Sequence, residues 1–290
     1  MRSLIDFDWK WFFLRLYERS FEMDLFNRAA QVAFYFSFSL FPFLLFLFGV
    51  FGLVLESTDA LRRELYVYFA RILPLSAYDL VRTTVNEISQ GSSTGKITVG
   101  LIIALWSASA GIDSVRSALN AVYGLKETRF YGKIKLQSLG LTVLLGVLIG
   151  LVLVFFFIGW RLVQIGLGAA GFQITSPLVL VLIQWIPVIL VLLFPCEVIY
   201  NLLPNFKVHR WIWITPGSVV AILVWIGLLS GFKLYLTYFD TYNRTYGSLG
   251  AVIILMFWLY LTSVALLVGG LINAVLAERA QPKQIVSTVE

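Results

Sequence analysis

The chain has 290 residues, of which 59% are hydrophobic and only 13% are charged, and its mean hydropathy is +0.87. Because a soluble domain carries about 25% charged residues, this composition excludes an ordinary soluble protein and predicts an all-α, polytopic membrane helix bundle. The net charge of +6 fits basic loops on the cytoplasmic face of such a protein and gives no separate sign of nucleic-acid binding.

Residues 1–28 predict a helix that lies in the membrane interface. Trp9, Phe12, Phe13, Leu16 and Tyr17 recur at helical spacing and form the face expected to lie against the acyl boundary. Lys10, Arg15, Glu18 and Glu22 are expected elsewhere around the helix. The apolar run that follows, of about 27 residues, exceeds the roughly 7–15 residues of a signal-peptide core. We therefore expect this N-terminal helix not to be a cleavable signal.

Residues 29–277 predict one membrane domain of about six spanning helices. A helix needs roughly 20 apolar residues to cross a bilayer, and six segments reach or approach this length. The expected spans are about 29–55, 96–112, 136–159, 177–203, 211–232 and 249–277. Residues 56–95 carry two apolar stripes separated by Pro74 and predict an amphipathic outer segment, and residues 278–290 are expected to form a tail.

The fourth span is the most irregular part of the predicted bundle. Proline removes a backbone donor and crowds the carbonyl one turn back. Three prolines mark candidate helix breaks: Pro42 in the first span, and Pro187 and Pro195 in the fourth. Glu197 is the only acidic residue of the fourth span and is followed by Tyr200 and Asn201. Two interpretations remain open: Glu197 lines a path or pocket in the membrane, or it reaches the headgroups from near the helix end.

A polar face continues from the second span. Asp113, Arg116 and Asn120 stand at positions i, i+3 and i+7, and therefore lie on one side of a helix. Asp113 and Arg116 are spaced for an ion pair, which stabilises a helix by only a few tenths of a kcal/mol when it is exposed. If the pair lies inside the bundle, its charges need partners there and mark a site.

The distribution of Lys and Arg predicts the orientation. Six spans place both termini on one side, and this side carries 14 of the 22 Lys and Arg residues. Since basic loops stay in the cytoplasm, we expect both termini there. A polar vestibule facing the cytoplasm then contains nine candidate substrate-path residues: Gln31, Tyr35, Asp113, Arg116, Asn120, Glu197, Tyr200, Asn201 and Asn273. The alternative is a packed polar seam.

Four segments carry the motifs of a known family. They are AAQVAFYFSFSLFPFLLFL, LWSASAGIDSVRSALNAVYG, EVIYNLLPN followed by TPG, and YGSLGAVIILMFWLYLTSVALLVGGLINA. These motifs resemble the YihY/BrkB family, and the similarity covers essentially the whole chain. The resemblance implies a bacterial inner-membrane protein of about six spans. It also brings the historical labels "virulence factor" and "ribonuclease BN", and a suspected transport role.

The resemblance carries over individual positions and also shows two departures. The shared positions are Tyr35, Pro42, Trp106, Asn120, Tyr200, Pro204, Asn205, Gly217, Tyr246, Gly247, Trp258, Gly269 and Asn273. Leu271 stands where relatives often have an acidic residue, and Asn201 stands where they often have arginine. If those charges serve transport in the family, this chain pairs its charges differently or moves another solute.

The leading functional hypothesis is a transporter or flippase-like permease for an unidentified substrate, with anionic solutes and lipids as candidates. The alternative is a non-transporting membrane scaffold or assembly partner. A ribonuclease is disfavoured because His209 is the only histidine and the acidic residues are scattered, so we expect no enzyme. Membrane lipids and the substrate are the expected partners. The sequence indicates no nucleic acid, cofactor or metal, and it leaves a homo-oligomer open.

Overall fold

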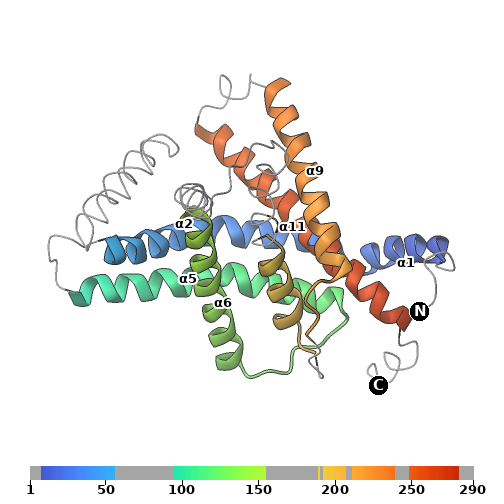
Figure 1. Ribbon diagram of the computed structural model, residues 1–290, viewed down its shortest axis with the longest axis horizontal. Coiled ribbons are helices and arrows are strands. Elements are labelled where there is room, and N and C mark those ends of the chain that lie inside the picture. Colours follow the sequence, from blue (N-terminus) through green and yellow to red (C-terminus); the bar gives the residue numbers. More distant parts are fainter. Residues whose placement is uncertain are drawn as a thin grey trace, which may run out of the picture.

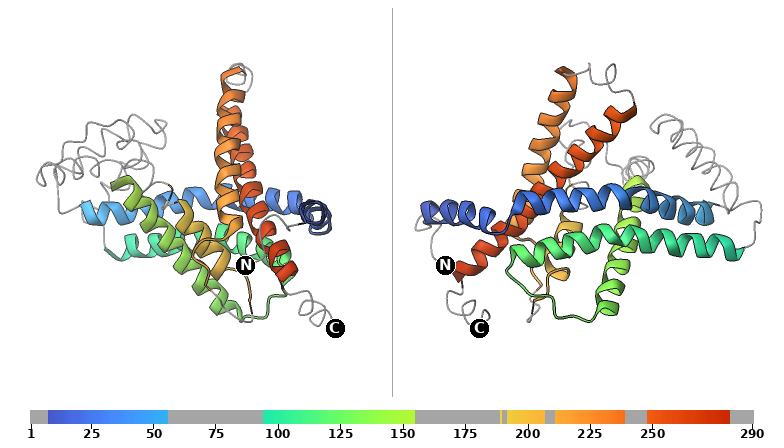
Figure 2. Two further views of the ribbon diagram at one scale, coloured as in Figure 1. Left: turned by 45° about the vertical axis from the view of Figure 1, so that its right-hand side comes forward. Right: turned by 180° about the vertical axis from the view of Figure 1, so that it is seen from behind.

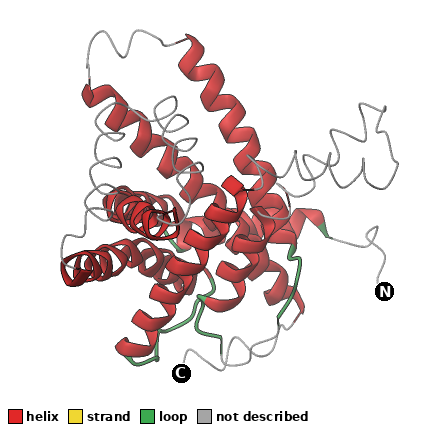
Figure 3. Ribbon diagram, turned by 60° about the vertical axis from the view of Figure 1, so that its left-hand side comes forward, coloured by secondary structure: helices red, strands yellow, loops and turns green. Residues whose placement is uncertain are grey.

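A computed structural model describes residues 8–55, 94–154, 189, 192–206, 211–238 and 248–280. Every regular element in these ranges is a helix, which confirms the all-α prediction (Figure 1). Figure 3 shows the described part of the chain as helices, with loops at some of the connections. Several predictions fall outside the described residues: the helix break at Pro187, the loop containing His209, nearly all of the outer segment 56–95 and most of the tail 278–290.

Six long helices and one short helix make up the described fold. They are α1 (Trp9–Glu22), α2 (Leu25–Leu55), α5 (Thr94–Val122), α6 (Tyr131–Val154), an unlabelled helix (Leu192–Leu202), α9 (Pro216–Tyr238) and α11 (Ser248–Ala280). Within the described residues, three segments are long and apolar enough to cross a membrane, namely Val99–Val122, Tyr131–Leu151 and Val252–Arg279. Two shorter apolar helices accompany them, Leu192–Leu202 and Pro216–Phe232.

The helices converge at one end of the bundle. α2 and α5 run antiparallel along each other, α6 packs across α5, and α11 crosses α2 (Figures 1 and 2). The hydrophobic core lies where α2 begins and where α5 and α11 end, and Leu25, Leu119 and Val275 are fully buried there. The connection 123–130 and the loop residues 203–206 and 211–215 lie at this same end, so polar loop residues can reach the interior of the bundle there.

α9 and α11 cross at two glycines. A Cβ atom at Gly217 would lie 2.1 Å from the carbonyl oxygen of Gly269, and a Cβ atom at Gly269 would lie 2.5 Å from the carbonyl oxygen of Gly217. Small residues allow such close backbone approach between helices in a membrane. A Cβ atom at Gly269 would also collide with the Cβ atom of Ala221 in α9 and with the hydroxyl of Tyr200. This crossing holds the first turn of α9 against α11.

A sharp turn separates α1 from α2. Asp8 caps α1 by accepting a hydrogen bond from the backbone N–H of Trp11 at 3.0 Å. Asp24 has a φ of 50°, in the left-handed region that aspartate adopts more readily than most side chains. Figure 2 shows the consequence: its left view looks along α1, whereas α2 is seen from the side. The two helices therefore do not continue one another.

Candidate functional site

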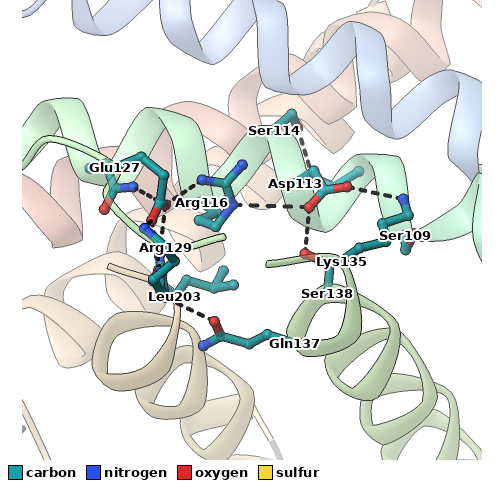
Figure 4. Close-up of polar contacts among 12 residues, drawn as sticks. Ser109, Asp113, Ser114, Arg116, Glu127, Arg129, Lys135, Gln137, Ser138 and Leu203 are labelled. Carbon is teal, nitrogen blue, oxygen red and sulfur yellow. Dashed lines mark hydrogen bonds and ion pairs between the residues drawn. The ribbon is translucent and has the colours of Figure 1, made fainter. Parts of the chain in front are cut away.

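The Asp113 carboxylate joins α5 to α6. Its Oδ2 atom accepts a hydrogen bond from Nζ of Lys135 at 3.1 Å, and its Oδ1 atom accepts one from Oγ of Ser138 at 2.5 Å (Figure 4). Lys135 is only 6% exposed. Its ammonium group also donates to the carbonyl of Trp106 at 3.3 Å and lies 4.7 Å from the centre of the Trp106 ring. The Asp113–Lys135 pair thus places two charges inside helices that are apolar enough to cross a membrane.

Arg116 lies between two acids. Its Nε atom is 4.0 Å from Oδ1 of Asp113, whereas its Nη1 atom is 2.5 Å from Oε2 of Glu127. The closer contact makes Glu127 its main partner, and Asp113 pairs chiefly with Lys135 (Figure 4). The i, i+3 spacing therefore describes only the weaker of the two ion pairs of Asp113.

A second set of polar residues fastens the connection 123–130 to the end of the helix Leu192–Leu202. We call it the loop cluster, and it consists of Asn120, Glu127, Arg129, Gln137 and Asn205. The Glu127 carboxylate accepts bonds from Nε and Nη2 of Arg129, both at 2.8 Å, and from Nδ2 of Asn120 at 2.9 Å. Oδ1 of Asn120 in turn accepts the backbone N–H of Asn205 at 2.8 Å.

The same cluster caps the short helix. The last carbonyls of a helix have no partner within it. Here Arg129 donates to the carbonyl of Leu203 at 2.8 Å, and Gln137 donates to the carbonyl of Leu202. Arg129 also donates to the side chain of Gln137 at 2.8 Å. Side chains from the loop and from α6 thus bind the end of this helix.

Glu127 makes the loop cluster sensitive to acid. The hydrogen bonds from Arg129 lower the pKa of Glu127 to about 2, further helped by Arg116 and opposed by partial burial. A lowered folded-state pKa stabilises the fold above the ordinary carboxyl value, near 4.5, and that stabilisation is lost as the pH falls toward 2.

We therefore expect Glu127→Gln to lower the thermal unfolding midpoint at pH 7 and to reduce the loss of stability between about pH 4.5 and 2. The measurement is thermal unfolding in detergent across this range. Glu18→Gln is the matched control, because Glu18 is an exposed acid on α1. A wild-type and a Glu127→Gln curve that run parallel through this window would show that Glu127 is not the sensitive group.

A third polar group surrounds Glu197. We call it the cap cluster, and it consists of Glu197, Asn201, Thr215, Ser218 and Asn273. Glu197 is 2% exposed. Its Oε1 atom accepts the backbone N–H of Thr215 at 2.6 Å, the Thr215 hydroxyl at 3.2 Å and the Ser218 hydroxyl, and its Oε2 atom accepts Nδ2 of Asn201 at 3.3 Å. The carboxylate therefore sits at the positive N-terminal end of α9.

Asn273 completes the cap from α11. Its Oδ1 atom accepts the N–H of Gly217 at 2.8 Å, and its Nδ2 atom donates to Oγ1 of Thr215 at 3.0 Å. The Thr215 hydroxyl also accepts the N–H of Ser218 at 3.3 Å. The free N–H groups of the first turn of α9 are thus satisfied by side chains from two other helices and from the preceding residue.

The remaining candidate residues have different surroundings. Tyr200 is 2% exposed, and its hydroxyl donates to the carbonyl of Leu266 at 2.7 Å beside the glycine crossing. Gln31 and Tyr35 lie on the exposed side of α2, and Tyr35 is 42% exposed. α2 continues through Pro42 without a break.

The structure thus divides the nine candidate path residues into groups. Asp113, Arg116 and Asn120 share one polar region with α6 and the loop 123–130, and Glu197, Asn201 and Asn273 belong to the cap cluster. Pro195 lies in the first described turn of the helix Leu192–Leu202. That helix joins the two regions, because Glu197 belongs to one and the carbonyls of Leu202 and Leu203 belong to the other.

Sequence reasoning did not single out Lys135, Glu127, Arg129 or Ser138. Lys135 and Asp113 are 22 positions apart, and Arg129 and Leu203 are 74 apart, so no helical spacing relates them. One feature of the sequence does point to Lys135 and Ser138: these polar residues stand one helical turn apart at the start of an apolar helix. Within the described ranges, no three His, Cys, Asp or Glu residues gather closely enough to hold a metal ion.

Comparison with known proteins gives the family. The model of the family described as Virulence factor BrkB matches residues 16–287. The chain belongs to the Virulence factor BrkB family. Among BrkB relatives, it is 34% identical to a ribonuclease-like protein YfkH of Bacillus subtilis over 258 residues, which are 87% of this chain and 90% of the relative. No solved structure matches.

A second group of relatives is longer. The chain is 28% identical over 281 residues to a UPF0761 membrane protein of Xanthomonas oryzae and equally to one of Xanthomonas campestris. The match covers 92% of this chain but only 61% of each relative. With the apolar helices described above, these matches establish a membrane protein of the BrkB family.

Proposed function

We propose that this BrkB-family protein is a permease of the bacterial inner membrane, with both termini in the cytoplasm. Its path begins at the polar end of the bundle and passes the Asp113–Lys135 pair. An anionic solute or the anionic headgroup of a lipid is the substrate class that the charges favour. The proposal has no enzymatic step and does not extend the ribonuclease-like name of the Bacillus relative to this chain.

The Asp113–Lys135 pair is the observation that carries this proposal. Charged side chains within spanning helices are costly, and those that occur line pathways or pair with one another. A pair that served only to join α5 to α6 could be replaced by apolar side chains at little cost in stability. Asp113 retains 26% side-chain exposure although Lys135 is buried, so one side of the pair is open to its surroundings.

The charge balance near the pair favours an anion. Arg116, Arg129 and Lys135 face two acids, Asp113 and Glu127, which leaves one positive charge in excess. Lys126 and Lys133 are exposed next to this group and add two more. Positive charge at a cytoplasmic opening attracts anionic solutes and anionic headgroups alike.

A flux assay in liposomes tests the proposal. Wild-type protein is compared with the double variant Asp113→Asn/Lys135→Met, which removes both charges together and so avoids an unpaired buried charge. The panel contains small organic anions, inorganic phosphate and fluorescent phospholipids. We expect wild-type flux of at least one anion or lipid, and at least a tenfold loss in a double variant that still elutes as a folded protein.

Single variants separate transport from stability. Asp113→Asn alone leaves Lys135 with a buried charge and should lower the unfolding free energy by roughly 3 kcal/mol, whereas the double variant should recover most of this loss. Ser230→Ala is the matched control, because Ser230 is exposed on α9 and bonds only to its own helix. Full flux in a folded double variant would contradict the proposed path.

A specific observation favours the scaffold as the second candidate. The three polar groups are held largely by protein partners, and the crevice between α9 and α11 is too narrow for a water molecule to enter. Trp225, Trp258 and Thr262 line this crevice. Absence of flux for every member of the panel, with a folded wild-type protein, would favour an assembly role over transport.

A further inference from the structure

Helix α1 has two different faces. On one side, Phe12 is buried in the core, and Trp11 and Leu16 pack against it, so Phe12 and Leu16 do not belong to the exposed face that their spacing predicts. On the other side the exposed large side chains follow a helical stripe, with Phe13 59% exposed and Tyr17 65% exposed. Trp9, Leu14 and Phe21 extend this exposed aromatic face. The rings of the stripe contact each other, with centroids 6.1 Å apart for Trp9 and Phe13 and 4.8 Å apart for Tyr17 and Phe21.

The charges of α1 are sorted between these faces. Arg15 and Arg19 turn toward α11, where Arg15 lies 2.7 Å and Arg19 3.6 Å from the Glu278 carboxylate. At 100° per residue, Glu18 and Glu22 fall to the side of the aromatic stripe, and both also contact these arginines. Lys10 is the one charged residue whose position falls within the stripe, and it is exposed. The exposed aromatic face of α1 therefore carries a single positive charge and no acid.

The ion pairs also fix how α1 is held. Glu278 belongs to the last turns of α11, and the Arg279 guanidinium of the same helix lies 5.6 Å from the ring of Trp11. The hydrogen bond from Arg15 to Glu278 raises the pKa of Arg15, so the guanidinium side of this clamp stays charged. α1 thus cannot turn about its own axis without breaking contacts to α11.

We propose that the exposed aromatic face of α1 docks into the headgroup and acyl boundary of the bilayer, and that the Glu278 clamp sets its orientation there. Three observations name a lipid surface as the occupant. The chain is a membrane protein of a known family. Phe26 and Phe34, near the start of α2, are also large exposed apolar side chains. Its aromatic and lysine composition, without acids, complements the interface and anionic headgroups.

The test uses the full chain in nanodiscs that hold one copy each. Cys196 is replaced by alanine, and single cysteines at Phe13, Tyr17 or Glu18 carry an environment-sensitive fluorophore. The quencher is phosphatidylcholine spin-labelled near the headgroup, in discs of phosphatidylcholine and phosphatidylglycerol. We expect quenching at positions 13 and 17 to be at least about three times that at position 18. Equal quenching at the three positions would overturn the proposal.

Two further arms make the result decisive. Discs that hold two copies test a second chain as the occupant, and shielding of positions 13 and 17 that appears only there would overturn the lipid assignment. Glu278→Gln tests the clamp. With α1 released, the ratio of quenching at 13 and 17 to that at 18 should fall at least twofold, and an unchanged ratio would overturn the role of Glu278.

Discussion

Gly217→Ala should destabilise the protein by at least about 3 kcal/mol or prevent recovery of a folded species. The added Cβ atom would lie 2.1 Å from the carbonyl oxygen of Gly269 and 2.6 Å from the side chain of Asn273. Overpacking of a core typically costs about 1–3 kcal/mol, and the cost should be at the upper end here because a backbone atom cannot rotate away. If the backbone at Gly217 moved away to make room for the Cβ atom, the hydrogen bond from the Gly217 N–H to Oδ1 of Asn273 would also lengthen.

The control for this change is Gly227→Ala in the same helix. A Cβ atom at Gly227 meets no heavy atom within 4 Å, and alanine is the better helix former by roughly 1 kcal/mol. We therefore expect Gly227→Ala to be neutral or stabilising. Chemical unfolding in detergent measures both variants. Equal stability of the Gly217→Ala and Gly227→Ala proteins would show that α9 and α11 do not cross at these glycines.

Glu197→Ala should cost roughly 3–5 kcal/mol, because it removes the shared acceptor of several buried donors. The backbone N–H and hydroxyl of Thr215 and the hydroxyl of Ser218 all donate to Oε1 of Glu197. A buried donor left without a partner costs about 1–3 kcal/mol, and the negative charge that favours the N-terminus of α9 is lost as well. Glu197→Gln keeps one acceptor oxygen and should cost less.

Hydrogen exchange locates this effect. In Glu197→Ala the amides of residues 211–222 should exchange faster, while those of the α2–α5 pair should change little. Glu18→Ala, which removes an exposed acid of α1, is the control. Faster exchange spread evenly over all helices would indicate general unfolding rather than loss of the cap. Unchanged exchange at residues 211–222 would contradict the capping role.

The capping geometry gives Glu197 a structural task that its sequence context did not reveal. Pro195 and the apolar run around Glu197 predict an isolated acid in a spanning helix, with either a path or the headgroups as its surroundings. The structure surrounds it with donors from Thr215, Ser218 and Asn201 instead. Whether Glu197 also takes part in transport is a separate prediction, which flux through a folded Glu197→Gln protein measures.

The two departures from the family pattern occupy different surroundings. Leu271 is 1% exposed and belongs to the hydrophobic core. Asn201 donates to Oε2 of Glu197 and to the carbonyl of Ile212 at 3.1 Å, and accepts the N–H of Ile212 at 3.2 Å. An uncharged amide thus serves both Glu197 and the chain that leads into α9.

The sequence by itself determined the class of the protein. Charge is scarce and apolar runs are long enough for spanning helices. In a bilayer each backbone polar group needs a protein partner, and a helix supplies these partners within its own segment. The 3.6-residue period likewise placed Asp113, Arg116 and Asn120 on one face. These properties depend on neighbours within one helix, and local spacing describes them fully.

Only the tertiary structure decided which polar groups meet. Lys135 reaches Asp113 from another helix, Arg129 reaches the carbonyl of Leu203 across 74 positions, and Glu197 and Asn273 meet at the start of α9. The physical reason is that helix ends carry unpaired N–H and C=O groups, and a buried end must find partners wherever packing brings a side chain. Which side chain lies near a helix end depends on how the helices cross. Glycines such as Gly217 and Gly269 permit the crossing, but no local sequence pattern specifies it.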